Sequence, residues 1–155
     1  MALFICLLVT GCAGVSQLLP PPGQGWTTHL GQLAYSSKKR DFMGDIVMQV
    51  SPDGGIKLDF MKGPGPSLVS IRQTTERARV EGALMPIAWQ GAPASAPALL
   101  SGWLTIQPTL QALQSGKPLP KGVKANLGKS SSGAWKQLEI SIPARQERFL
   151  FIFQS

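Results

Sequence analysis

Cysteine and histidine are nearly missing from this chain. Its 155 residues contain two cysteines, Cys6 and Cys12, and a single histidine, His29. Beyond residue 12 there is no thiol, which excludes disulfides, zinc-cysteine sites and cysteine catalysis from the body of the protein. A single histidine with no carboxylate cluster beside it indicates a partly exposed structural side chain rather than a ligand. No metal or cofactor is therefore expected.

Acidic residues are few and scattered, which argues against an enzyme. No two of the carboxylates fall together in an apolar stretch where one pKa would be raised for acid-base catalysis. Ser70 and Ser101 have no histidine nearby to activate them, and Gly63 and Gly65 lack the following Lys-Ser/Thr of a phosphate-binding loop. No catalytic residue is predicted. The eight carboxylates are Asp41, Asp45, Asp53, Asp59, Glu76, Glu81, Glu139 and Glu147.

Long apolar runs are also missing, because no stretch reaches the 18 or more residues that a membrane-spanning helix needs. A short apolar run occupies residues 2–9 and is followed by small residues and Cys12. The sequence Val-Thr-Gly-Cys at residues 9–12 resembles the lipobox of bacterial lipoproteins, whose cysteine is acylated with fatty acids such as palmitate. The resemblance implies a signal peptide over residues 1–11 and a lipid anchor on Cys12. The alternative is a buried N-terminal strand or helix.

Residues 12–25 are small, polar and rich in proline. Three consecutive prolines at residues 20–22 favour an extended polyproline conformation, which spaces a domain from a membrane at up to ~3 Å per residue. Ala13 after the cysteine resembles the outer-membrane sorting signal of enteric bacteria. We therefore expect a tether over residues 12–25 and a single domain over residues 26–155. The expected location is the outer membrane, with the lipid-anchored domain facing the periplasm.

The apolar pattern after the tether changes from helical spacing to alternation. Spacings of three and four at Trp26, Leu30, Leu33 and Ala34 predict a short helix. Apolar and polar residues then alternate in four successive segments separated by Gly- and Pro-containing turns, which predicts an antiparallel meander. The predicted strands cover residues 42–50, 56–60, 68–71 and 77–81.

The middle of the chain interrupts this alternation. Residues 91–97 read as a loop, and a helix is predicted to begin at Pro97, where proline fits the first turn. A second helical turn begins at Pro108 and ends near Gly116. Strands return at residues 136–142 and 148–153, and the last one is apolar on both faces, so we expect it to be covered on both sides. The predicted buried face of the first helix holds Leu99, Leu100, Trp103 and Leu104.

This order of elements resembles the LolA/LolB family of lipoprotein carriers and receptors. Residues 40–44 (Arg-Asp-Phe-Met-Gly) look like the family's first strand. Residues 58–71 look like its strand, Gly-Pro turn and strand, and residues 98–116 look like its lid-helix region. The resemblance implies an α+β fold: a strongly curved antiparallel sheet, an unclosed half-barrel, with short helices covering its concave face.

The concave face of that family receives the acyl chains of lipoproteins. The resemblance therefore implies a hydrophobic groove between sheet and helices in a monomeric receptor. Its partners would be lipoprotein acyl chains or a periplasmic lipoprotein carrier. Alternation sends the strand residues to one side, where the apolar stripe of the helix is buried. The groove would be lined by Phe42, Ile46, Met48, Leu58, Phe60, Leu99, Leu100 and Trp103.

Positive charge is in excess, since 15 Lys and Arg against 8 Asp and Glu give a net charge of +7. Residues 117–136 contain five lysines and no acid, and they include Trp135. This stretch predicts contact with an anionic membrane surface, and nucleic acid is not an expected partner of a secreted lipoprotein. The alternative is a solvated loop whose lysines keep the protein soluble. The lysines are Lys117, Lys121, Lys124, Lys129 and Lys136.

Two functions stay open from the sequence. In the first, the protein is a LolB-like binding protein that accepts acyl chains or lipoproteins for outer-membrane localisation. In the second, the same apolar residues form a dry core, and the protein is a structural or envelope-assembly lipoprotein. A cavity between the helices and the sheet would favour the first function, and native-density packing would favour the second.

Overall fold

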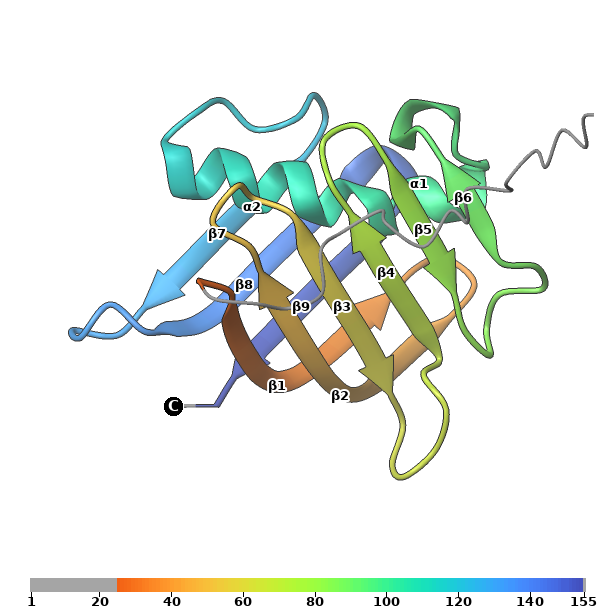
Figure 1. Ribbon diagram of the computed structural model, residues 1–155, viewed down its shortest axis with the longest axis horizontal. Coiled ribbons are helices and arrows are strands. Elements are labelled where there is room, and N and C mark those ends of the chain that lie inside the picture. The colour runs from red at the N-terminus through yellow and green to blue at the C-terminus, as the bar shows by residue number, and fades with distance from the viewer. Residues whose placement is uncertain (1–24, 155) are drawn as a thin grey trace, which may run out of the picture.

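One antiparallel sheet of nine strands and one helical stretch make up the computed structural model, which describes residues 25–154. The order of strands in the sheet is β6-β5-β4-β3-β2-β1-β9-β8-β7. The sheet does not close, and β6 and β7 are its two edges (Figure 1). The prediction of an unclosed antiparallel sheet is confirmed, in a fold that is mostly β. The strands are β1 (Thr27–Ser36), β2 (Asp41–Val50), β3 (Ile56–Met61), β4 (Val69–Gln73), β5 (Ala78–Glu81), β6 (Trp89–Gly91), β7 (Lys124–Lys129), β8 (Trp135–Ile142) and β9 (Glu147–Phe153).

The meander of β2 to β5 agrees with the alternation in the sequence. Met48 pairs with Leu58, which in turn pairs with Ile71, so a buried row crosses three neighbouring strands. The turn between β2 and β3 is fixed by Ser51, whose hydroxyl accepts a hydrogen bond from the Gly55 amide at 2.8 Å. These pairings align the apolar residues of the meander on the inner face of the sheet.

β1 replaces the short helix that was predicted at residues 26–34. Leu33 and Tyr35 alternate as buried residues, whereas Leu30, which the helical spacing counted as buried, is 48% exposed. Gly31 suits a strand here because a Cβ at this position would overlap the carbonyl oxygen of Ile152 on β9. β1 pairs with both β2 and β9, so it joins the meander to the C-terminal strands.

A single helical stretch, residues 98–115, takes the place of the two separate helical segments predicted. It comprises α1 (Ala98–Ser101), the 3₁₀ turn η2 (Trp103–Thr105) and α2 (Ile106–Ser115), and is called here the helical cover. Pro108 falls in the first turn of α2, where its missing amide has no intrahelical partner to lose. Gly116, with φ of 66°, ends α2 in the left-handed conformation. Shorter 3₁₀ turns occur at Pro93–Ser95 (η1) and Pro143–Arg145 (η3).

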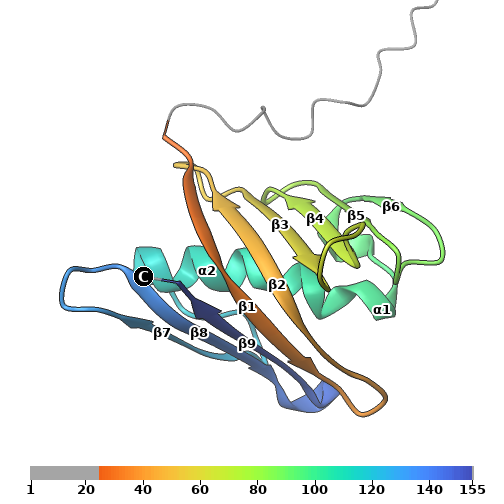
Figure 2. The ribbon, with the colours of Figure 1, turned by 90° about the horizontal axis from the view of Figure 1, so that it is seen from below.

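The helical cover lies against the inner face of the sheet (Figure 2). Ile106 and Leu110 of α2 are buried in the same core as the strand residues. Two side-chain amides tie the cover to the sheet, each with a 2.8 Å hydrogen bond to a backbone carbonyl: Gln73 of β4 donates to Leu104, and Gln107 of α2 donates to Gly54. The core therefore forms one layer between the cover and the sheet.

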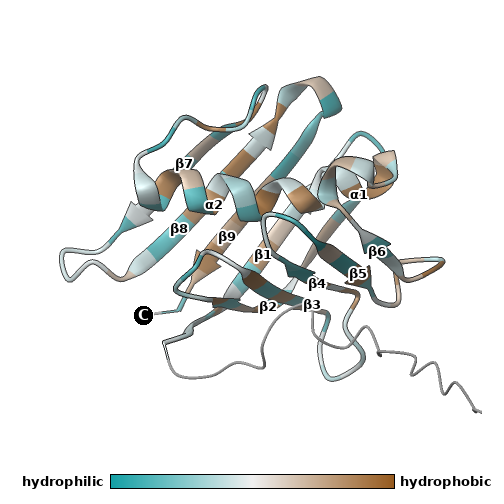
Figure 3. Cartoon of the chain, turned by 45° about the horizontal axis from the view of Figure 1, so that its top comes forward, coloured by the Kyte–Doolittle hydropathy of each residue, from teal (hydrophilic) through white to brown (hydrophobic). Residues whose placement is uncertain are grey.

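The C-terminal strands differ from the prediction in two ways. β8 and β9 occur where alternation placed them, but Ile152 on the outer face of β9 is 46% exposed. The expectation that β9 is covered on both sides was therefore wrong. Among residues 25–154 the helical cover packs on one face only, and hydrophobic and hydrophilic residues alternate along the strands (Figure 3). The short edge strands β6 and β7 were not predicted, because they lie in stretches that read as loops.

Candidate functional site

The strand residues of the predicted groove lie together on the inner face of the sheet. Ile46 and Phe60 pair across β2 and β3, and Met48 and Leu58 pair one row further along. All four are at most 2% exposed. Phe42 is half-buried near the start of β2 and packs against this cluster. The sequence therefore predicted correctly which residues share this face.

The helical cover brings two of its three predicted residues to that face. Leu100 and Trp103 are each 4% exposed. The Trp103 ring centroid lies 6.1 Å from that of Phe60 and 5.1 Å from that of Phe149. Leu99 points away from the core and is 61% exposed, which corrects its placement on the buried stripe. The reason is that α1 has only four residues, so one turn presents a narrow buried face.

Little free space remains between these two surfaces. One slot of about 40 Å³ opens where α1 meets the sheet. Because a water molecule occupies about 30 Å³ in the liquid, the slot has no room for an acyl chain in this conformation. It is lined by Tyr35, Arg40, Phe42, Val69, Leu84, Met85, Leu99 and Trp103. Six of the eight residues predicted to line a groove are packed as a core here, and Phe42 and Leu99 are the exceptions.

A polar contact fastens α1 to the start of β9. Glu147 is 8% exposed, and its carboxylate accepts hydrogen bonds from Arg145 Nε at 2.9 Å and from the Tyr35 hydroxyl at 3.2 Å. The guanidinium of Arg145 also donates to the backbone carbonyl of Ala98 in α1. A Cβ at Gly102 would overlap the Glu147 carboxylate. We call Tyr35, Arg145 and Glu147 the latch.

The latch perturbs the pKa values of two of its members. Burial raises the pKa of the Tyr35 hydroxyl, and the neighbouring Glu147 carboxylate raises it further, although a hydrogen bond with Ser37 opposes this shift. The hydrogen bond to Glu147 raises the pKa of Arg145 above its usual value. Tyr35 therefore stays neutral and Arg145 stays charged over the physiological range, which keeps the latch closed there.

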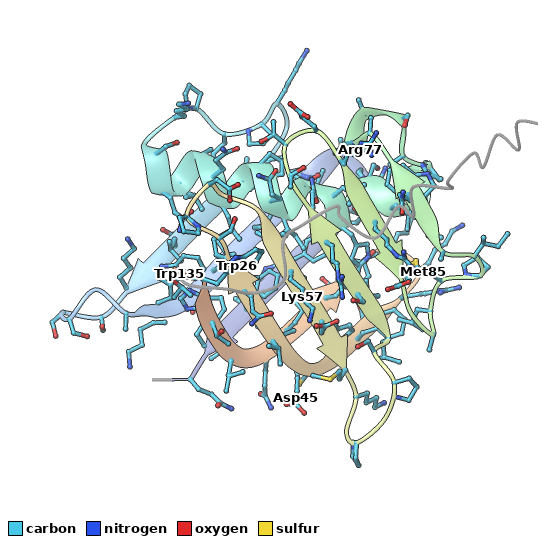
Figure 4. The ribbon with its side chains drawn as sticks, in the orientation of Figure 1. Trp26, Asp45, Lys57, Arg77, Met85 and Trp135 are labelled. Carbon is cyan, nitrogen blue, oxygen red and sulfur yellow. The ribbon has the colours of Figure 1, made fainter. Side chains whose placement is uncertain are left out.

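A larger opening lies at the opposite end of the sheet. This depression has a volume of about 790 Å³ and is lined by side chains from β1, β8, the end of α2 and the turns nearby. His29 and Trp135 stack at 4.0 Å between ring centroids with their planes 3° apart. No acidic, lysine or arginine side chain lines the opening among the residues described. Figure 4 shows Trp135 at this end and Met85 of the slot at the other.

The sequence did not predict a role for His29 beyond a helical surface position. Burial lowers its pKa below the ordinary value of 6.5, so the imidazole is neutral at pH 7. Its partner Trp135 is 8% exposed and packs edge-on against Phe153. Trp135 therefore belongs to the inner face and does not extend the lysine-rich surface with which the sequence grouped it. Recognising β1 as a strand would have placed His29 on the inner face.

The five lysines predicted to contact a membrane are all exposed, but they do not lie on one loop. Lys117 and Lys121 lie between α2 and β7, Lys124 and Lys129 are the two ends of β7, and Lys136 is in β8. β7 is an edge of the sheet, and its register shifts between Gly128 and Lys129. Lysines and a bulge on an edge strand prevent it from pairing with other chains. Lys124 and Lys129 stand at the positions where such protection acts.

Metal-ligating side chains do not gather within the part of the chain that the structure describes. No three His, Cys, Asp or Glu side chains there come close enough to hold a metal ion. No helix in the same part is long and apolar enough to span a membrane. The predicted lipidation site Cys12, the signal peptide over residues 1–11 and all but the last residue of the tether lie outside the described residues.

Comparison with known proteins neither supports nor contradicts the resemblance to the LolA/LolB family. No model of a known protein family matches this chain, and no curated protein matches it. Membership of the LolA/LolB family therefore stays a prediction that rests on the order and pattern of the elements.

Proposed function

We propose that this protein is a LolB-like lipoprotein of the outer membrane that accepts an acyl chain between its sheet and its helical cover. In this proposal the domain faces the periplasm and takes its cargo from a lipoprotein or a lipoprotein carrier. The observation that carries the proposal is the open sheet with a largely apolar inner face under a single interrupted helical stretch. The cover then acts as a lid over the concave face of a half-barrel.

Several features suit the α1 end of the cover to opening. A 3₁₀ turn separates α1 from α2, and such interruptions within helices often mark hinges. Gly102 directly precedes this turn. The α2 part is held by the Gln107 hydrogen bond, whereas α1 is held by the latch and by the burial of Leu100. Outward movement of residues 98–103 would widen the existing slot without disturbing the sheet.

The energetics allow an acyl chain to replace the side chains that now fill the space. Lifting Leu100 out of the core costs about 1.5–3 kcal/mol. Lifting Trp103, whose buried ring is larger, costs about 4–6 kcal/mol. Burial of ten methylene groups returns about 8 kcal/mol. Met48 lies under the cover, and its flexible thioether adapts to ligands of different shape. A closed apo form and an open loaded form are therefore both accessible.

The second candidate function is that of a structural or envelope-assembly lipoprotein. The dense packing under the cover and the small size of the slot favour it. In that case the cover never opens, the core stays dry, and the protein acts through its surface. The two candidates differ in whether an apolar chain binds at the slot.

A titration with a fluorescent 16-carbon fatty acid separates them. Leu99→Glu places a charge at the mouth of the slot, on a side chain that is already exposed, so folding should be preserved. Leu30→Glu is the matched control, because Leu30 is also exposed but does not line the slot. We expect the parent and Leu30→Glu to bind the probe equally, and Leu99→Glu to bind at least about tenfold more weakly, since a buried charge opposes an apolar ligand.

Copurifying lipid gives a second readout that needs no added probe. Native mass spectrometry of the protein should reveal an acyl-containing ligand that is depleted in Leu99→Glu. If the parent neither copurifies with lipid nor binds the fatty acid, the acyl-binding proposal is wrong and the structural candidate replaces it.

A further inference from the structure

Three loops lie at the same end of the sheet as the slot, where α1 also packs. The loops are residues 37–40 between β1 and β2, 62–68 between β3 and β4, and 82–88 between β5 and β6. Arg40 from the first loop, Met85 from the third loop and Leu99 from α1 line the slot together. The second and third loops are joined by 3.0 Å hydrogen bonds from the amides of Ala83 and Leu84. We call these loops, α1 and the adjoining Met43 the slot-end surface.

Large apolar side chains project from this surface into solvent. Ile87 is 81% exposed, Met43 is 66% exposed and Leu99 is 61% exposed. These are the three most exposed large apolar side chains of the described residues, and each comes from a different element. All three belong to segments at one end of the sheet, and Met43 lies there on the outer face, where it lines a depression with Asp41 and Arg148. Three such residues at one end differ from the single scattered apolar residues of an ordinary protein surface. Such a group marks a site of contact with another apolar phase.

The charge of the same surface has one sign. The three loops carry Lys38, Lys39, Arg40 and Lys62, all exposed, and they contain no acidic residue. None of these four cations forms an ion pair with any residue in the described part of the chain. Two acids flank the loops in sequence: Asp41 directly follows the first loop, and Glu81 directly precedes the third and is paired with Arg79. The four cations are therefore available to an anionic partner.

We propose that the slot-end surface docks onto an anionic lipid bilayer. The four cations lie among the headgroups, and Met43, Ile87 and Leu99 reach the boundary with the acyl chains. Cationic residues beside projecting apolar ones are the combination that holds a protein at a membrane interface. A bilayer accepts separate apolar tips because its lipids rearrange around them, whereas a protein partner would need a matching pocket for each tip. This inference does not depend on acyl binding under the cover.

The proposal assigns a different orientation from the one that the lysines at 117–136 suggested. The slot-end surface faces the membrane, while β7 lies at the opposite edge of the sheet from the β3 to β6 side. The slot then opens toward the bilayer. The orientation is testable because the two basic surfaces lie in separate peptides of the chain.

Hydrogen-deuterium exchange of the full lipid-anchored protein on vesicles measures which surface is covered. Vesicles of phosphatidylcholine with phosphatidylglycerol are compared with vesicles of phosphatidylcholine alone. We expect slower exchange in peptides covering residues 37–43 and 84–88 on the anionic vesicles. The protection should fade with added salt, because screening weakens the attraction.

Two triple variants with the same change of charge separate the two surfaces. K38Q/K39Q/R40Q should lower the protection at the slot-end surface by at least about tenfold, since each cation near the membrane contributes up to roughly fivefold in binding. K117Q/K121Q/K124Q is the matched control and should leave the protection at the slot-end surface unchanged. Ile87→Ser should weaken the protection and preserve its dependence on salt.

Three results would overturn the proposal. The first is protection confined to peptides within residues 117–136. The second is equal protection at the slot-end surface on neutral and anionic vesicles. The third is protection without vesicles that rises with protein concentration, which would mean that a second copy of the chain covers this surface. The fatty-acid titration with Leu99→Glu reports on the slot separately, so failure of one proposal is distinguishable from failure of the other.

Discussion

The carboxylate of Glu147 at the start of β9 lies directly against Gly102 in the helical cover. The space between them does not admit even a Cβ on residue 102. Tyr35 and Arg145 hold the carboxylate in place from the other side. This contact sets how closely the cover approaches the sheet at its α1 end.

Gly102→Ala should therefore destabilise the folded protein. The added methyl group displaces the Glu147 carboxylate, and overpacking of this kind costs about 1–3 kcal/mol. The effect opposes the helix propensity of alanine, which alone would stabilise the helix by about 1 kcal/mol. Urea denaturation measures the free energy of unfolding. Gly65→Ala, with no atom near the added Cβ, is the control and should change it by less than about 0.5 kcal/mol.

Arg145→Met should loosen the cover, because it removes both the ion pair to Glu147 and the hydrogen bond to Ala98. A buried carboxylate without its cation costs about 1–3 kcal/mol of stability. Fatty-acid binding should become stronger in the same variant, since less of the binding energy opposes opening. Arg148→Met breaks the exposed pair with Glu139 and should cost at most about 1 kcal/mol. Equal effects of the two variants would contradict the role of the latch.

The stack of His29 on Trp135 predicts a dependence of stability on pH. Burial lowers the pKa of His29, so the unfolded chain takes up a proton at a higher pH than the folded protein does. Stability is then lost as the pH falls through 6.5 toward the pKa of the folded state. His29→Phe keeps an aromatic ring without this titration. Between pH 7.5 and 5.5 the parent should lose more unfolding free energy than His29→Phe, and equal losses would refute the prediction.

Lipidation of Cys12 is the prediction from the N-terminal sequence. Cys12→Ser should abolish both processing after residue 11 and attachment of the anchor. The parent should fractionate with the outer membrane, and the variant should keep residues 1–11 when its mass is measured. If both proteins are processed alike and partition alike, the lipoprotein interpretation fails.

The sequence predicted the β meander because its inward positions are consistently apolar. In β2 and β3, Ile46, Met48, Leu58 and Phe60 recur at every second position, and most residues between them are polar. Turn residues such as Gly54 mark where each strand ends. These signals depend only on residues close together in sequence, so the strands can be predicted without knowledge of the rest of the fold.

The errors came from features that depend on distant neighbours. Gly31 looked like a weak helix position, but it allows β9 to approach β1 closely. Leu99 shares the spacing of its buried neighbours, yet the shortness of α1 leaves it outside. The latch joins Tyr35 to Glu147 across 112 positions of sequence, and no local pattern reveals such a contact. The volume under the cover likewise depends on packing that residue types alone do not determine.

The most direct test of the central claim is to locate a bound acyl chain by NMR. Palmitate labelled with ¹³C along its chain is added to the protein, and contacts between the chain and assigned side chains are recorded. We expect contacts with Leu58, Met48 and Leu100, together with chemical-shift changes at Trp103. Contacts limited to exposed Leu30 and Ile152 on the outer face, or none at saturating palmitate, would contradict acyl binding under the helical cover.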